Sequence, residues 1–214
     1  MKKTLLMLTL AAATLPLGVW ANIEWVGGSA GNWGDSANWS GTVEPHRFNY
    51  SKMNGAAATV TFGNAETLTS GLWIENNIAG QVTFTADSLD KGLTQTGGNL
   101  NLGTGTHGAL AINGGTYHFA NDILTGIGCW ADNACGDLTI LSGRVETSYW
   151  LVLGTFWVDD YAKWHAGTQG NVTIEGGELI VGYRDGATQN DGVIDMGRSP
   201  GSTLTILQNG GTVS

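Results

Sequence analysis

One short pattern returns along this chain and restricts what the chain can fold into. In VTIEGGELIV, residues 172–181, alternating apolar residues stand on both sides of two adjacent glycines. Alternation is typical of half-buried strands, and paired glycines weaken any strand that they interrupt. We therefore expect the chain to turn a corner at each glycine pair. Related copies begin at Leu93, Leu110 and Leu138, and a slipped copy begins at Leu204.

Two architectures are compatible with this repetition. Units that recur at roughly 20–50 residues are typical of solenoids, in which inward side chains of one coil stack on those of the next. We accordingly predict an all-β fold, a right-handed parallel β-helix. The expected columns are Leu110, Leu138 and Val172; Ile112, Ile140 and Ile174; Tyr117, Val145 and Leu179; and Phe119 with Val181. The alternative is an antiparallel β-sandwich or a meander of hairpins, because two glycines between alternating strands also suit a tight hairpin turn.

Irregular segments separate the repeats and carry most of the sequence that does not alternate. The main insertions cover residues 128–136, 155–170 and 183–192. We expect them to project from the solenoid as loops, because they lack the strand pattern and differ in length from one unit to the next.

The N-terminus has the pattern of a secretory signal peptide. Lys2 and Lys3 precede an apolar stretch, Leu5 to Leu17, that is too short to span a bilayer comfortably, and cleavage is predicted after Ala21. No later stretch is as apolar, so no membrane-spanning segment is expected after residues 1–21 are removed. We predict an exported protein that is extracellular or at the cell surface, associated with the outer membrane and periplasmic only in transit.

Charge and composition restrict the partners. The chain has 18 acidic and 9 basic residues, and charged residues make up 13%, about half the usual share. Removal of residues 1–21 takes away two basic residues and makes the remainder more acidic. This balance argues against nucleic acid as a partner. The 34 glycines suit an all-β protein with many tight turns.

The two cysteines, Cys129 and Cys135, bracket a short segment, CWADNAC. In an exported protein we predict that they form a local disulfide. Closing so short a loop should stabilise the fold by only about 2 kcal/mol. The segment has too few further ligands to predict a zinc site.

A tryptophan-rich segment follows the predicted signal peptide. It reads IEWVGGSAGNWGDSANWSG, with Trp25, Trp33 and Trp39, and AAATVTFG follows downstream. These motifs and the glycine repeats resemble bacterial exported proteins with autotransporter-associated β-strand repeats. The resemblance implies a right-handed parallel β-helix displayed at, or released from, the cell surface. We expect residues 22–63 to be a Trp-rich cap and residues 64–214 to be repeats, truncated at the C-terminus because NGGTVS ends within a unit. The tryptophans either cover the end of the first coil or form a platform for stacking sugars.

The best cluster for chemistry lies in FWVDDYAKWH, residues 156–165. Paired carboxylates beside aromatic rings suit a glycan cleft, although a solvated loop with hydrophobic anchors has the same composition. The predicted ligand-binding residues, by contact with a glycan, are Trp157, Asp159, Asp160, Tyr161, Trp164 and His165. Of the signatures found in β-helical glycoside hydrolases only the bare Asp-Asp is present, and Thr106-His107-Gly108 lacks its first glycine. We therefore predict no enzyme and no catalytic residues.

Metal and cofactor sites are not predicted. The segment from Asp185 to Asp195 is rich in oxygen ligands, yet Ala187 breaks the calcium-loop register. His118 lies between Tyr117 and Phe119, so alternation directs it outward as a surface residue. The predicted function is a non-enzymatic β-solenoid, a surface structural and adhesive module whose partner is a glycan or another cell-surface component. The alternative is a carbohydrate-binding or polysaccharide-degrading β-helix protein.

Overall fold

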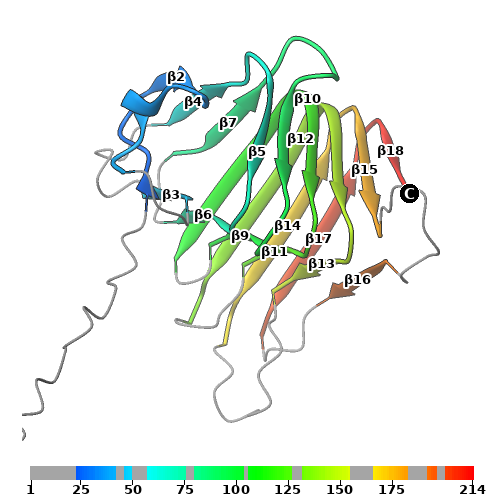
Figure 1. Cartoon of the computed structure of the whole chain (residues 1–214). Coiled ribbons are helices and arrows are strands. Elements are labelled where there is room, and N and C mark those ends of the chain that lie inside the picture. The colour runs from blue at the N-terminus through cyan, green and yellow to red at the C-terminus, as the bar shows by residue number, and fades with distance from the viewer. Residues whose placement is uncertain are drawn as a thin grey trace, which may run out of the picture.

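A computed structural model shows a chain built of β-strands. It describes residues 23–41, 46–49, 57–75, 80–103, 106–126, 132–154, 166–182, 192–196 and 201–214. Within these ranges the only helix is a single 3-10 turn, η1 (Ser36–Asn38), and the strands β1 to β18 form two sheets (Figure 1). The predicted signal peptide, residues 1–21, lies outside the described ranges.

The two sheets differ in width. The seven strands of the narrow sheet are β1 (Ile23–Glu24), β3 (His46–Asn49), β6 (Leu72–Glu75), β9 (Leu100–Leu102), β11 (Ile123–Thr125), β13 (Trp150–Leu153) and β16 (Val193–Met196). The eleven strands of the wide sheet are β2 (Ala30–Asn32), β4 (Ala58–Thr61), β5 (Ala65–Leu68), β7 (Val82–Thr85), β8 (Gly92–Gln95), β10 (His107–Phe119), β12 (Cys135–Thr147), β14 (Gln169–Ile174), β15 (Glu178–Val181), β17 (Thr203–Gln208) and β18 (Thr212–Val213).

The wide sheet has two arms, and the chain visits them in a fixed order. The first arm contains β2, β4, β7, β14 and β17, and the second contains β5, β8, β15 and β18; the long strands β10 and β12 run through both. From β4 onward the chain passes through the first arm, the second arm and the narrow sheet, and then starts again one strand further along. We call each such round a coil. In Figure 1 the colours accordingly pass from blue at one end of the stack to red at the other.

Every pairing between these strands is parallel. β14 and β15 flank Gly176 and Gly177, but each pairs with β12 on one side and with β17 or β18 on the other, not with its chain neighbour. The antiparallel sandwich or hairpin meander is therefore wrong, because a hairpin would pair the two strands across the glycines. The parallel sheets are compatible with a β-solenoid.

The stacking register confirms the predicted columns. Leu110 pairs with Leu138 and Leu138 with Val172, while Tyr117 pairs with Val145 and Val145 with Leu179. The columns Ile112–Ile140–Ile174 and Phe119–Thr147–Val181 follow the same register. The last copy begins two residues later than predicted: Ile206, not Leu204, pairs with Val172, and from that start the copy aligns without a gap.

The copy predicted to begin at Leu93 belongs to a different part of the coil. Leu93 pairs with Tyr117 rather than stacking under Leu110, and Val82 occupies the position below Leu110. Gly97 and Gly98 therefore lie at the corner between the second arm and the narrow sheet, not between the two arms. The sequence pattern misled because two different corners of the coil use adjacent glycines after an alternating strand.

The corner between the two arms requires glycine for two reasons. Gly143 and Gly177 have φ of +88° and +74°, which side-chain-bearing residues rarely adopt. These corners also stack closely, since a Cβ on Gly177 would lie 2.3 Å from the carbonyl oxygen of Gly143. The prediction that paired glycines mark corners is thus confirmed between the arms.

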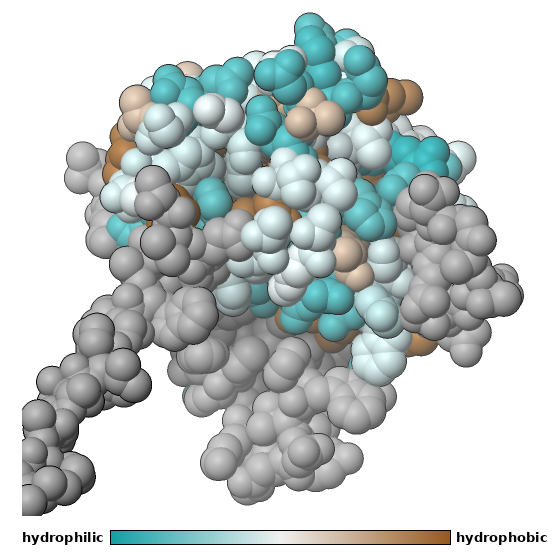
Figure 2. All heavy atoms as spheres, viewed as in Figure 1, coloured by the Kyte–Doolittle hydropathy of each residue, from teal (hydrophilic) through white to brown (hydrophobic). Residues whose placement is uncertain are grey.

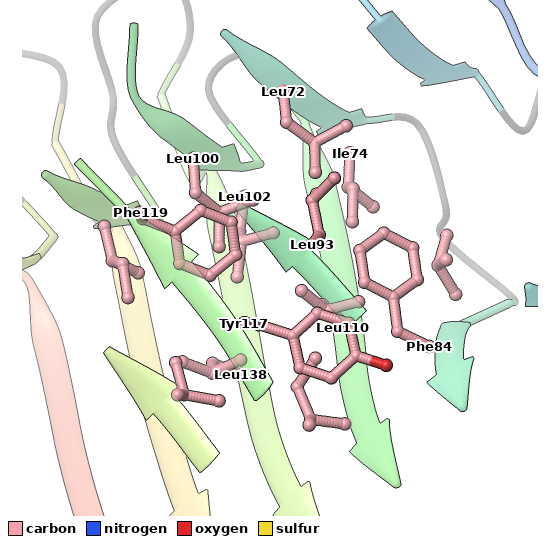
Figure 3. Close-up of a cluster of buried hydrophobic side chains, with 14 of the residues drawn as sticks. Leu72, Ile74, Phe84, Leu93, Leu100, Leu102, Leu110, Tyr117, Phe119 and Leu138 are labelled. Carbon is pink, nitrogen blue, oxygen red and sulfur yellow. The ribbon is translucent and has the colours of Figure 1, made fainter. Parts of the chain in front are cut away.

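The core lies between the wide and the narrow sheets. Figure 3 shows Leu72, Ile74, Leu100 and Leu102 of the narrow sheet pointing toward Tyr117 and Phe119 of the second arm. All of these side chains are at most 1% exposed. The hydroxyl of Tyr117 is buried with no hydrogen-bond partner, an exception among buried polar groups.

The tryptophan-rich segment joins this core. Trp25 and Trp33 are buried, and the Trp39 ring packs edge-on against both. Trp33 stacks on Phe62 with ring centroids 5.2 Å apart, and Phe62 in turn contacts Phe84. An aromatic row therefore leads from the N-terminal end into the interior of the stack.

Candidate functional site

The glycan residues predicted from the sequence fall outside the described part of the chain. Trp157, Asp159, Asp160, Tyr161, Trp164 and His165 all belong to residues 155–165, which are not described. The ends of that segment are described, at Gly154 and Ala166. The oxygen-rich segment from Asp185 to Asp195, in which no calcium site was predicted, is likewise outside except for its last residues, of which Asp195 is half-buried in β16.

The ends of the inserted segments gather at one edge of the stack, which we call the loop edge. The chain leaves the narrow sheet at Gly103, Gly126 and Gly154. Each of these glycines donates a backbone hydrogen bond to the preceding coil, at Ile74, Leu102 and Thr125 respectively. The chain returns to the first arm at Thr106, Ala134 and Thr168, whose carbonyls accept from Cys135, Gln169 and Thr203 on the following coil. Two insertions are also shorter than predicted, because residues 135–136 belong to β12 and residues 169–170 to β14.

The base of residues 155–165 is closed by a buried threonine. The Thr168 hydroxyl lies 2.6 Å from the carbonyl oxygen of Gly154, to which it donates, and 2.8 Å from the hydroxyl of Ser202. Thr168 is fully buried. A buried hydroxyl with two partners fixes where this segment leaves and rejoins the stack.

Of the two cysteines, only Cys135 is described. It begins β12, is half-buried and has no disulfide partner among the described residues. Burial, together with the nearby Asp137 carboxylate, raises the pKa of this thiol to about 11. Cys129 lies outside the described residues, so the disulfide between Cys129 and Cys135 stays a prediction.

A shallow hollow of about 310 Å³ lies where the second arm turns into the narrow sheet. Its lining comes from three successive coils: Asn99, Asn121, Asp122, Tyr149 and Trp150. Asp122 organises it, because its Oδ1 accepts from the backbone N–H of Trp150 at 3.2 Å and its own N–H donates to Asn99 Oδ1 at 3.4 Å. Burial raises the pKa of the Asp122 carboxyl, and the Trp150 hydrogen bond opposes this.

The chemistry of this hollow suits a hydroxyl-rich ligand. Tyr149 is 39% exposed and offers an aromatic surface, while the Asn99 and Asn121 amides and the Asp122 carboxylate provide donors and acceptors. A few polar groups around an aromatic surface are what a small-molecule site requires. Sequence analysis missed these residues because they precede β9, β11 and β13, which are far apart in the chain and meet only through the stacking register.

A second polar group covers the outside of the second arm. His118 Nδ1 lies 3.2 Å from Glu146 Oε2, and Arg144 bridges Glu146 and Glu178. Tyr117 and Phe119 point inward, so the outward direction predicted for His118 is confirmed. Glu146 is only 5% exposed, but its carboxylate has the Arg144 guanidinium and the His118 ring as partners, as buried carboxylates require. This ladder therefore joins β10, β12 and β15 and does not line the hollow.

The face in Figure 2 is mainly hydrophilic or neutral, with hydrophobic residues in scattered spots. Among the described residues, no helix is long and apolar enough to span a bilayer.

Comparison with known proteins identifies no relative. No protein family matches the sequence, and no curated protein or solved structure is similar to it.

Proposed function

We propose that this chain is an exported, non-enzymatic β-solenoid that acts as a surface structural and adhesive module. In this proposal the coils form a parallel β-helix that winds to the right. Crossover connections between parallel strands of one sheet are right-handed in about 98% of cases. The stack is the scaffold, and its loops make the contacts. The likeness to proteins with autotransporter-associated β-strand repeats is part of the same hypothesis and rests on sequence motifs alone.

The observation that carries this proposal is the loop edge. Successive coils hold the ends of the inserted segments in line, through hydrogen bonds from Gly126 and Gly154 on one side and to Ala134 and Thr168 on the other. A stack of parallel strands is rigid along its axis, so segments anchored in this way face a partner together. Residues 155–165, with their aromatic and acidic side chains, are the segment we propose for contact.

The tryptophan cluster supports a further part of the proposal, an N-terminal cap. A stack of parallel strands leaves its first coil open to water unless something covers it. Trp33 is buried beside Phe62, directly after β4, and Phe84 of β7, while Trp25 is buried against Trp39, which is the packing that a cap requires.

Export and adhesion are tested separately. Expression of the full chain in a bacterium with an outer membrane should give a product that begins at Asn22 and is cleaved by protease added to intact cells. A product that keeps residues 1–21 and stays in the cytoplasm would contradict export.

Adhesion is tested by replacing residues 155–165 with a glycine-serine segment of equal length. Beads coated with the wild-type protein should adhere to immobilised glycans or bacterial surfaces, and the replaced variant should lose that adhesion while unfolding at the same temperature. A variant with Leu141→Ala, at an exposed side chain on β12, serves as the control and should adhere like the wild type. Equal adhesion of the replaced variant would assign contact to another part of the molecule.

Carbohydrate binding is the second candidate, and the hollow favours it. A sugar ring stacked on Tyr149 would place its hydroxyls near Asp122 and Asn99. On a glycan array, Tyr149→Ala and Asp122→Asn should each weaken binding about tenfold or more, roughly the loss of one good contact. Binding that is unchanged in both variants would exclude the hollow as the site.

The non-enzymatic part of the proposal has its own test. A reducing-sugar assay across acidic polysaccharides should show no turnover by the wild-type protein. Turnover that disappears in Asp160→Ala would replace this proposal with that of a polysaccharide-degrading enzyme.

A further inference from the structure

Three side chains of different chemistry meet on the outside of the first arm, next to the loop edge. Successive residues of a strand point to opposite faces, so Cys135 and Asp137, two apart on β12, share the outer face. His107 on β10 pairs in register with Cys135 and therefore points the same way. The register partner of Asp137 on β10 is Ala109, whose small side chain leaves the diagonal from His107 to Asp137 open.

The distances bring potential ligand atoms into one small volume. His107 Nε2 lies 2.7 Å from Asp137 Oδ2, and Cys135 Sγ lies 4.0 Å from Asp137 Oδ1. One nitrogen, one sulfur and one oxygen of these residues all lie within 4.8 Å of one another. Around a tetrahedral zinc ion the ligand atoms are roughly 3.3–3.8 Å apart, as bonds of about 2.0–2.3 Å require. Small side-chain rotations would thus bring all three atoms to bonding distance.

A fourth residue holds the carboxylate in place. Asn171 on β14 is in register with Asp137, and its amide Nδ2 donates to Asp137 Oδ1 over 2.7 Å. This leaves Oδ2 directed at His107. Residues that hydrogen-bond a metal-ligating carboxylate in this way orient it for the ion.

We propose that His107, Cys135 and Asp137 bind one divalent transition-metal ion of the zinc class, with Asn171 positioning Asp137. Imidazole, thiolate and carboxylate are the three ligand types that zinc takes in proteins. Three protein ligands leave a fourth position of the tetrahedron open to water or to a ligand oxygen. The side chains of His107 and Asp137 are 29% and 32% exposed, so an ion can reach the site from solvent.

The proposal conflicts with the predicted disulfide and does not depend on the proposed function. A Cys135 sulfur bonded to Cys129 has no thiolate to offer, so the metal site exists only in the thiol form. The variant Cys129→Ser removes the disulfide and leaves all three ligands in place, which makes it the reference protein for the test.

The test is a titration of the untagged full chain, as Cys129→Ser and as reduced wild type, with cobalt(II) alone. We expect one ion per chain, visible absorption of tetrahedral cobalt and a thiolate-to-cobalt charge-transfer band, all displaced by zinc. On the Cys129→Ser background, His107→Gln, Cys135→Ser and Asp137→Asn should each weaken binding about 100-fold or more, and Asn171→Ala about tenfold. Zinc should raise the melting temperature of the reference protein but not that of the Cys135→Ser variant.

The matched control is His118→Gln, which alters another histidine–carboxylate pair on an outer face of the same two strands. It should bind cobalt like the reference protein. Absence of the charge-transfer band in both reference forms would overturn the proposal. Binding that survives Cys135→Ser and Asp137→Asn would do so as well, because the ion would then be held elsewhere.

Discussion

The two ends of the described stack are built from the same kind of strand but differ in how well their side chains are covered. At the N-terminal end, Trp25 and Trp33 are 1% and 6% exposed, and Trp33 packs against Phe62 and Phe84. At the other end, the inward-facing Ile206 of β17 is only partly buried, and Val213 of β18 is 37% exposed. Alternation thus decides on which face of a strand a side chain lies. Burial of that side chain also requires a neighbouring coil or segment to cover it.

The strands in the middle show the same dependence within single columns. Val172 is fully buried between Leu138 and Ile206, while Ile206, the last member of its column in the described chain, is only partly buried. Leu179 and Val213 form a second such pair. The comparison between the two ends can therefore be tested with pairs of apolar residues that are adjacent in one column and differ mainly in how well the next coil covers them.

The largest effect is expected for Trp33→Ala. The mutation removes a buried ring that stacks on Phe62 and meets Phe84 edge-on. We expect the free energy of unfolding to fall by about 3–5 kcal/mol, as for other buried aromatic truncations. Urea unfolding measures it, with Tyr149→Ala as an exposed aromatic control. A loss below about 1 kcal/mol would mean that the tryptophan-rich end contributes no more to stability than the C-terminal end of the described stack.

The sharpest comparison comes from Leu179→Ala and Val213→Ala. The two residues are neighbours in one column, with Leu179 1% exposed and Val213 37% exposed. Leu179→Ala should cost about 2–5 kcal/mol, because it leaves a cavity. Val213→Ala should change stability by no more than about 0.5 kcal/mol, as surface substitutions usually do. Equal losses, measured by chemical denaturation, would contradict the view that coverage by a neighbouring coil decides burial.

Two glycines, one in the tryptophan-rich segment and one at a corner of the stack, allow a further comparison in which a smaller effect is expected. Gly28, in the tryptophan-rich segment, and Gly143, at a corner of the stack, both have positive φ. A Cβ on Gly28 would meet nothing within 4 Å, whereas a Cβ on Gly143 would lie 2.6 Å from the backbone of Gly114. Gly28→Ala should therefore cost only the conformational penalty of about 1–2 kcal/mol, and Gly143→Ala clearly more. Thermal melts of both variants would show whether stacking, beyond conformation, demands glycine at the corner.

The smallest expected effect has the opposite sign. Tyr117→Phe removes a buried hydroxyl that has no hydrogen-bond partner, so we expect a gain of about 1 kcal/mol. A loss of stability on urea unfolding at neutral pH would show that the hydroxyl is satisfied.

Tyr117→Phe should also change how the stability of the protein depends on pH in the alkaline range. Burial raises the pKa of the Tyr117 phenol, so the folded protein keeps this proton more tightly than the unfolded chain does. Its contribution to stability is complete below about pH 10, the ordinary tyrosine pKa, and is lost as the pH rises above that value. Tyr117→Phe should therefore lose less stability than the wild type between neutral and strongly alkaline pH. Parallel losses would contradict the raised pKa.

The interior was predictable from the sequence to a large extent, and the outer sites were not. Alternation and the glycine pairs were enough to place Leu110, Leu138 and Val172 in one column, because the repeats share their spacing. The same reasoning failed at Leu93, where the pattern belongs to another corner. The predicted glycan residues in 155–165 lie outside the described ranges, and neither the hollow at Asp122 nor the cluster at His107 was found.

The sequence by itself determined which residues face inward and where the chain bends, because strand periodicity and glycine backbone freedom are local properties. Only the tertiary structure decided which outward residues meet. His107 reaches Cys135 and Asp137, and Asp122 reaches Asn99 and Trp150, because the parallel register aligns residues on successive coils. Contacts across coils depend on the length of each intervening segment, and that register becomes visible only when the strands are paired.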